Sequence, residues 1–554
     1  MFDRRAILYI LLGITAFMLY EAWQKDYGVV SEISKQTTEE RSELRSSPEI
    51  FREDIIGTKI EQRGAVNRST KETIRVTTDV LDVIINLDGG DIEEANLLKY
   101  PKVMGESEPT KLLSVNGDRF YVARSNLVDD SKSNSKNQPI RYSSLSKHYK
   151  LDSNRDDLRV ELQWAKGGVR INKIYTFFNN RYDVCVDYEL ENKSSSSWHG
   201  NYYAEIQRKD FDGRSSIFQL STYTGAAVSN PEKPYEKISF SDMEEIVKKH
   251  SGIIRNTKEG WVAMQQRYFL SAWIPEPDKV YKYFADVTES IYGIGFVGET
   301  ITVAPGDKYG VNSKLYLGPE IAENLAPLAK GLERTVDYGW LWIIAIGLFW
   351  ILKQLHEVVG NWGVAIILIT LLIKLLFYKL SESSGKSMAK MKELMPKLQT
   401  LKERYGSDRQ ALHRATMDLY KREGVNPMSL GGCLPMLIQI PFFIALYYVL
   451  VNAVELRQAP FMLWIQDLAA QDPFYVLPVL MGISMLLQQK LSPSSLDPTQ
   501  AKVMMIMPVV FTFLFATFPA GLVLYWLVNN VLSIFQQWYI NRCLDREAKI
   551  SRKK

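Results

Sequence analysis

Hydrophobic and polar positions divide the chain into two unlike parts. Between residues 25 and 335 the apolar positions come in short alternating runs, whereas residues 336–540 are dominated by long apolar stretches. The segments LRVELQW, VRINKIYTFF and YDVCVDYEL, separated by glycine and asparagine turns, are typical of an antiparallel meander. We therefore predict a large all-β, β-sandwich-like domain at 61–320 and an α-helical membrane bundle after it.

The long apolar stretches predict six transmembrane helices, five of which form the core of the bundle. The first, residues 1–24, follows Arg4 and Arg5 and lacks a small-residue cleavage site, so we interpret it as an uncleaved anchor; a cleaved signal peptide is the alternative. The other predicted spans are 361–380, 428–454, 473–489 and two within 503–540. The fourth and fifth spans are short for a hydrocarbon core of about 30 Å, which suggests local thinning of the bilayer as a hypothesis.

The segments between the spans have distinct characters. A Trp-rich apolar run from Gly339 to Leu352 has only 14 residues and favours an interfacial helix rather than a span. We predict the following segments: a flexible polar linker at 25–60, a linker helix and the interfacial amphipathic helix at 321–360, a helical hairpin at 381–427, and loops at 455–472 and 490–502 before a basic tail at 541–554.

Charge placement orients this topology. The hairpin holds ten Lys/Arg against six Asp/Glu and the tail six against two, whereas the 455–472 loop is acidic. The positive-inside rule therefore places both termini and the hairpin in the cytoplasm, and the β-domain and the 455–472 loop outside.

Composition excludes several function classes. A net charge of +4 does not indicate nucleic acid as the main partner, and the scattered cysteines Cys185, Cys433 and Cys543 predict neither a disulfide framework nor a metal site. Gly293, Gly295 and Gly298 form GxGxxG, but a strand and a turn follow instead of a helix, so the motif lacks the context of a dinucleotide site. No hydrolase, metalloprotease or phosphate-loop motif occurs, and we expect no enzymatic activity, cofactor or metal.

Lys374 lies inside the second predicted span, WGVAIILITLLIKLLFYKL, whose other lysine, Lys379, is at the end of the span. A buried ionisable residue within a span is a functional hypothesis, but a lysine five residues before Lys379 can also snorkel to the headgroups. Thr370 lies on the same helix face, and a polar stripe follows the last span through Asn529, Ser533 and Gln536. Since no acidic residue lies in the later spans, we predict a wet, positively charged cavity lined by Lys374, Thr370, Gln439, Asn530 and Ser533. The alternative is that these polar residues pair between helices and only hold the bundle together, which is the more usual role of a single Asn or Gln in a span.

The hairpin has a narrow apolar seam. Apolar positions recur at helical spacing in Met388, Met391, Met395, Leu398 and Tyr405, with a break after Gly406. The seam fits a helical pair that holds apolar partners on a methionine-rich face, and it fits an ordinary solvated helical loop equally well.

Several long segments resemble the YidC/Oxa/Alb family of membrane protein insertases. The segments are SMAKMKELMPKLQTLKERYG, MDLYKREGVNP and FPAGLVLYWLVNNVLSIFQQ, and GWVAMQQRYFLSAWIP is the best match in the β-domain. The order of anchor, large external domain and five-helix core is similar to the Gram-negative form of the family.

The resemblance implies a bacterial inner-membrane insertase and chaperone that works alone or with the Sec translocon. A hydrophilic groove would receive the polar segment of a nascent membrane protein, while its apolar segment slides along the third and fifth helices at Pro435, Ile438, Phe442, Phe511 and Phe515. In the groove, Lys374 matches the positive residue that is often arginine in the family. Trp526 matches a groove position that can be tyrosine in relatives. Membrane lipids, ribosomes and the signal recognition particle receptor are the implied further partners. The alternatives are a transporter or channel, and a scaffold whose β-domain binds envelope partners.

Overall fold

The computed structural model describes residues 72–116, 119–129, 140–210, 223–250, 252–406, 408–423, 434–491 and 498–551. The chain divides into two compact units with a boundary between Val336 and Asp337. The predicted anchor at 1–24 and the linker at 25–60 lie outside the described residues.

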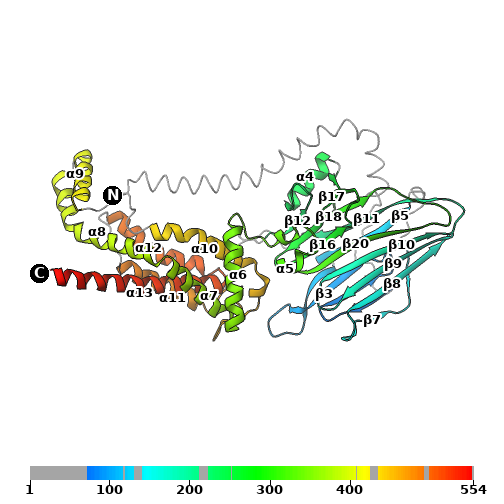
Figure 1. The fold of residues 1–554 in the computed structure, drawn as a ribbon, viewed down its shortest axis with the longest axis horizontal. Helices are drawn as coiled ribbons and strands as arrows, with labels where there is room; N and C mark the ends of the chain where they lie inside the picture. The colour runs from blue at the N-terminus through cyan, green and yellow to red at the C-terminus, as the bar shows by residue number, and fades with distance from the viewer. Residues whose placement is uncertain are drawn as a thin grey trace. The chain divides into compact units, whose positions relative to one another are not determined.

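The first unit is built on two large sheets (Figure 1). One sheet has the strand order β14-β17-β18-β11-β5-β4-β3-β2-β1-β7, with β19 paired to β11. These strands are β14 Ile253–Thr257, β17 Tyr281–Thr288, β18 Ile291–Gly298, β11 Trp198–Lys209, β5 Arg119–Asp129, β4 Pro109–Asn116, β3 Ile92–Pro101, β2 Leu81–Asn86, β1 Thr73–Thr77, β7 His148–Lys150 and β19 Ile301–Val303.

The other sheet has the order β13-β12-β15-β16-β20-β10-β9-β8-β6. The predicted meander forms its β8, β9 and β10, which pair antiparallel in sequence order. The strands are β13 Glu236–Ile238, β12 Gly225–Val228, β15 Val262–Gln266, β16 Phe269–Pro275, β20 Lys308–Pro319, β10 Asp183–Asn192, β9 Val169–Phe178, β8 Asp157–Lys166 and β6 Ser143–Ser144.

Buried side chains join the two sheets face to face. The Tyr121 hydroxyl of β5 donates to the Met264 carbonyl of β15 (2.8 Å), and the Tyr188 hydroxyl of β10 donates to the Ser125 carbonyl of β5 (2.7 Å). Alternating burial along strands such as β10 supplies the apolar layer between the sheets. The prediction of a large β-rich domain is therefore confirmed.

One element of the β-domain differs from the all-β expectation. A helix, α4 (Phe240–His250), packs on β14 and β17, because the charged segment at 240–250 also carries an apolar stripe that includes Met243 and Ile246. Short helices α5 (Ala322–Leu325) and η3 (Leu332–Thr335) follow the last strand. The three glycines of the GxGxxG motif lie within β18, so the motif forms no phosphate loop; a Cβ at Gly295 would press on the neighbouring strand β11.

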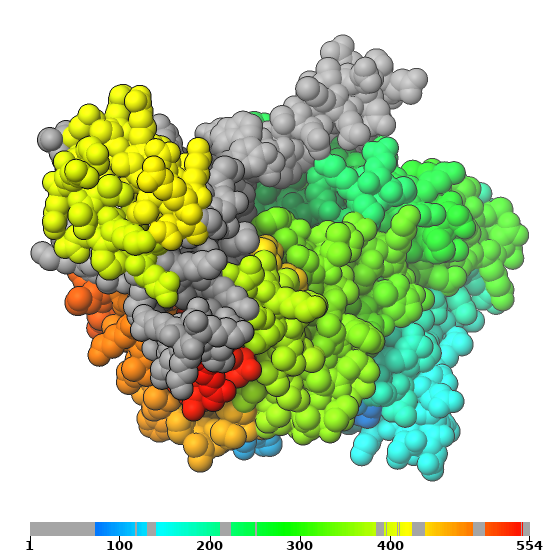
Figure 2. Space-filling model, turned by 60° about the vertical axis from the view of Figure 1, so that its left-hand side comes forward, coloured from blue at the N-terminus to red at the C-terminus, as the bar shows by residue number. Residues whose placement is uncertain are grey.

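The second unit is helical. Its described helices are α6 Trp342–Val359, α7 Trp362–Leu376, α8 Tyr378–Tyr405, α9 Arg409–Arg422, α10 Leu434–Asn452, α11 Val476–Leu491, α12 Pro498–Phe515 and α13 Ala520–Ser551, with the short η4 Val454–Leu456. Asp408 is the N-cap of α9, because its carboxylate accepts hydrogen bonds from the backbone N–H groups of Gln410 and Ala411. Figures 1 and 2 show the α8–α9 hairpin projecting beyond the other helices of this unit.

Helix α6 is longer than the predicted 14-residue run. It continues through Lys353 and His356 to Val359 because these polar residues still favour helix, and it ends at Gly360 in a left-handed conformation. By length and composition it is the one described helix able to cross a membrane; Trp362–Leu376, Ile438–Asn452, Val476–Lys490 and Met505–Phe515 are shorter apolar helices. Figure 1 shows α6 inclined steeply to α10, α11 and α13. The count of six spans stays a prediction.

Candidate functional site

The Lys374 side chain turns toward another helix. Lys374 lies in the last turn of α7 and is partly buried, and its ammonium donates to the Ser533 hydroxyl of α13 at 2.7 Å. The Ser533 hydroxyl in turn donates to the Asn529 carbonyl one turn earlier (2.7 Å). The ammonium is thus held inside the helical unit, across two helices, rather than extended along α7 toward Lys379.

Two of the residues predicted beside Lys374 use their polar groups elsewhere. Thr370 is 1% exposed and donates its hydroxyl to the Ile366 carbonyl of its own helix (2.6 Å). Asn530 is also buried, and its amide donates to the Ser484 hydroxyl of α11 at 3.1 Å. The polar positions of α13 therefore point in two directions, because neighbouring residues on a helix face different partners.

Gln536 adds an unused donor to the face that holds Ser533. It lies three residues after Ser533 on α13, and its Nε2 atom is buried without an acceptor among the residues that the structure describes. The spacing of three and four residues along the last span identifies Gln536 from the sequence. Only the packing of the neighbouring helices shows that its Nε2 atom has no acceptor among the described residues.

An aromatic cluster joins α10, α12 and α13. The Trp526 ring lies 4.6 Å from that of Phe443 and 4.9 Å from that of Phe515 between centroids, with Phe511 at 6.3 Å. The cluster contains the predicted groove residue and two predicted sliding-surface residues. Sequence reasoning missed Phe443, since the adjacent Phe442 has the same character and periodicity alone does not choose between them.

The cluster changes the picture of the sliding surface. Phe515 is 4% exposed, so its ring is enclosed by the cluster and is not presented to an outside chain. The exposed apolar residues of α12 are instead Met505, Ile506, Met507, Val509, Val510, Phe513 and Leu514.

On α10, the Phe442 ring packs edge-on against Phe377, which follows α7, at 5.2 Å between centroids. Ile438 and Gln439 are half-buried near the start of the same helix. Pro435 is described only by its position in α10. The contact brings the ring of Phe442, a predicted sliding-surface residue, against Phe377, which lies three residues after Lys374 in the chain.

The hairpin seam is apolar, with one ion pair at its edge. Leu394 and Leu398 of α8 are buried against Leu419 and Tyr420 of α9, and the Lys397 ammonium lies 2.6 Å from the Glu423 carboxylate. Tyr405 is half-buried at the end of α8. Met388, Met391 and Met395 lie in α8, but their side chains are outside the described part of the structure.

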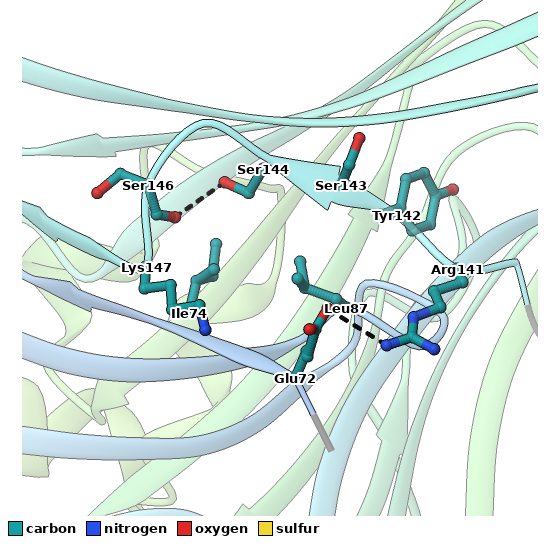
Figure 3. Close-up of a pocket in the computed structure, with 9 residues that line it drawn as sticks. All are labelled: Glu72, Ile74, Leu87, Arg141, Tyr142, Ser143, Ser144, Ser146 and Lys147. Atoms are coloured by element: carbon teal, nitrogen blue, oxygen red, sulfur yellow. Dashed lines mark hydrogen bonds and ion pairs between the residues drawn. The ribbon is translucent and has the colours of Figure 1, made fainter. Parts of the chain in front are cut away.

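The β-domain has a pocket of about 360 Å³ at the edge where β1 and β7 meet. Figure 3 shows the Arg141 guanidinium turned to the Glu72 carboxylate (3.3 Å), and the Ser144 hydroxyl turned to the Ser146 carbonyl (3.2 Å). The Ser146 hydroxyl donates to the His148 carbonyl (2.9 Å). Since these polar groups already bind one another, the pocket indicates no particular ligand.

Comparisons with known proteins define the class of the chain. Residues 73–351 match the family model described as the YidC periplasmic domain, and residues 354–547 match the model described as the 60Kd inner membrane protein. The chain is thus an inner membrane protein with a periplasmic β-domain.

Curated relatives then identify the family. A membrane protein insertase YidC from Coxiella burnetii is 44% identical over 99% of this chain and 98% of its own length, and one from Legionella pneumophila is 46% identical over 97% of both. A crystal structure of an active YidC insertase with its first transmembrane domain resolved covers 84% of this chain and 92% of its own, at 20% identity and a TM-score of 0.37. The chain belongs to the YidC family of membrane protein insertases.

Proposed function

We propose that this protein is a non-catalytic membrane protein insertase and chaperone of the inner membrane. The observation that supports the proposal is the Lys374 ammonium held on Ser533 within the helical unit. Together with Gln536, whose Nε2 atom has no acceptor among the described residues, it forms a positively charged polar face on α7 and α13. We propose that this face lines the groove that receives the polar segment of a client.

The charge of Lys374 is available to a client. Among the described residues it has a hydroxyl partner and no ion pair, so its charge is not cancelled by a neighbouring carboxylate. In a site of low polarity such a cation attracts carboxylates more strongly than it does in water. An acidic segment that enters the groove would gain this attraction, and Lys374 could keep its hydrogen bond to the Ser533 hydroxyl.

The apolar segment of the client has a separate surface. We propose that it slides along the exposed residues of α12, such as Val509, Val510 and Phe513, and along Phe442 of α10. Moving apolar surface from water into lipid is favourable, so its burial supplies the free energy of insertion. No nucleotide is required in this scheme.

Topology and partners follow from the same proposal. The steep inclination of α6 supports an interfacial position for this helix, with α7, α10, α11, α12 and α13 as spans and the anchor at 1–24 as the first. Both termini and the α8–α9 hairpin then lie in the cytoplasm. The hairpin and basic tail would meet ribosomes or the signal recognition particle receptor, and the Sec translocon would be an optional partner.

A charge reversal at Lys374 tests the proposal. Lys374→Glu should strongly reduce insertion of a small client with an acidic external segment, whereas Lys374→Arg should keep insertion because the positive charge remains. Insertion is measured by protease protection of the client in cells depleted of the native protein.

Lys379→Glu is the matched control, because it makes the same charge change on an exposed side chain five residues away. A client whose external segment has no acidic residue is the internal control. Normal insertion of the acidic client by Lys374→Glu would rule out the charged groove.

A further inference from the structure

The connection between α10 and α11, residues 453–475, is a folded piece with its own core, and we call it the α10–α11 loop. Ile465 and Leu468 are 2% and 1% exposed. The Phe461 backbone N–H donates to the Ile465 carbonyl (3.0 Å), and the Leu468 N–H donates to the Ala459 carbonyl (3.1 Å). A segment with this many internal contacts can transmit a fixed geometry to the helices it touches.

The loop holds the start of α7. Asn361 caps this helix by accepting from the Val364 backbone N–H (3.0 Å), and its side-chain amide donates to the Phe461 carbonyl of the loop (2.8 Å). Gly363, two residues later, lies so close to the Phe461 ring that a Cβ there would collide with it. The first turn of α7 is thus bound to the loop by a hydrogen bond and by close packing.

The loop also holds the start of α13. The Ala520 backbone N–H donates to the Ala470 carbonyl (2.7 Å), and the Gly521 N–H donates to the Leu468 carbonyl (2.9 Å). These are two of the donors at a helix start that have no partner within the helix itself. The first turn of α13 is therefore satisfied by the loop.

Asp472 ties the same loop to α11. Its carboxylate is buried, and three N–H groups donate to it: the Trp464 indole (2.9 Å), the Phe474 backbone (3.0 Å) and the Leu477 backbone (2.7 Å). The indole belongs to the middle of the loop, whereas Leu477 lies in the first turn of α11. One carboxylate thus closes the loop and caps the helix after it.

We propose that Asp472 is a positioning residue of the insertion site. Through the α10–α11 loop it fixes the spacing of α7, α11 and α13 at their N-terminal ends. These helices carry Lys374, Ser484 and Ser533, so the spacing decides whether the Lys374–Ser533 contact and the Ser484–Asn530 contact can form. The role in insertion rests on the proposed function; the role in helix spacing does not.

The test combines insertion with distances between helices. Spin labels are placed on exposed residues away from the loop, pairing Leu372 of α7 with Phe535 of α13, and Leu487 of α11 with Phe535, in the full-length protein with its native cysteines replaced by serine. Pulsed electron spin resonance gives each distance distribution in lipid nanodiscs, and protease protection gives client insertion.

Asp472→Ala should broaden both distance distributions and reduce insertion about tenfold or more, because a buried acceptor for three donors is lost. Asp472→Asn should give an intermediate effect, since its amide oxygen can still accept from some of these donors. Asp467→Ala is the matched control: this carboxylate lies in the same loop and accepts from the Ala469 N–H (2.8 Å) within the loop itself, so wild-type behaviour is expected.

Unchanged distance distributions in both Asp472 variants would overturn the proposal, whatever happens to insertion. Asp472→Asn keeps the test decisive where the alanine variant does not fold. Lys374→Glu in the same labelled background separates the two proposals, because it should strongly reduce insertion of the acidic client with distances unchanged. Normal insertion by that variant would refute the charged groove and leave the spacing role of Asp472 to be judged on the distances.

Discussion

Lys173 is a fully buried ammonium between the two sheets of the β-domain. Its Nζ atom donates to the Ser125 carbonyl (2.8 Å) and lies over the rings of Tyr175 and Tyr188, at 5.3 and 5.4 Å from their centroids. Burial lowers the pKa of Lys173 from 10.5 to about 8, and attraction to Asp91 opposes the change. We predict that this lysine makes the stability of the domain depend on pH.

The direction in which the stability changes with pH follows from the number of protons bound in each state. Between pH 8 and 10.5 the folded state binds fewer protons at Lys173 than the unfolded state does, so stability rises with pH in this window. The change in pKa corresponds to a penalty of about 3 kcal/mol when the lysine is charged in the folded state. About 2 kcal/mol of the penalty should be relieved between about pH 7 and about pH 9.5.

The assay compares the wild type with Lys173→Met, a variant of similar length without the charge. Denaturant unfolding of the full-length protein in detergent, followed by near-ultraviolet circular dichroism, gives the free energy of unfolding of the β-domain at each pH. The wild type should gain about 2 kcal/mol relative to the variant across the window.

The difference between the two proteins isolates Lys173, because other groups titrate in both. Burial raises the pKa of Glu205 to about 7 and that of Tyr121 to about 12, and both are retained in the variant. Lys166→Met, on the exposed end of β8, is the control and should follow the wild type. Parallel curves for the wild type and Lys173→Met would refute the reasoning.

Two further predictions concern the helical unit. Ser533→Ala removes the hydroxyl that accepts from the α7 ammonium, so insertion of acidic clients should fall several-fold with a stability change of about 1 kcal/mol, while Ser533→Thr should retain function; protease protection and thermal unfolding check both. Gly363→Leu should lower the unfolding temperature because its side chain collides with the α10–α11 loop, whereas Gly347→Leu, with open space at its Cβ, should not; equal thermal shifts would contradict the packing argument.

The sequence predicts which residues share a helix face better than it predicts which helix packs against that face. Spacing of three and four residues placed Ser533 and Gln536 on one stripe of α13, and the structure brings Ser533 to Lys374. The same spacing gave no sign that Thr370 bonds to its own helix or that Asn530 turns to α11. Periodicity fixes which residues share a face, but which helix lies opposite depends on tertiary packing.

Loops were the least predictable part of the site. Charge predicts an external loop at 455–472, but it gives no sign of the contacts of Asp472, which involve an indole eight residues earlier and two backbone groups just after it. No pattern of residue types announces such a contact, because the donors come from irregular backbone. Helix α6 extends past the 14-residue apolar run and ends at Val359, within the predicted 321–360 segment, because polar residues after an apolar run can continue a helix.

The two ends of α7 have opposite roles. Its first turn is bound to the α10–α11 loop, whereas Lys374 lies in its last turn, about 18 Å further along at 1.5 Å per residue. That distance is well below the hydrocarbon thickness of about 30 Å. Under the proposed function, a client segment attracted to Lys374 would therefore have only a short apolar stretch left to cross, and the end it would have to reach is the one that the loop holds in place. Such a site would lower the barrier to insertion by geometry and charge together, with α7 supplying both.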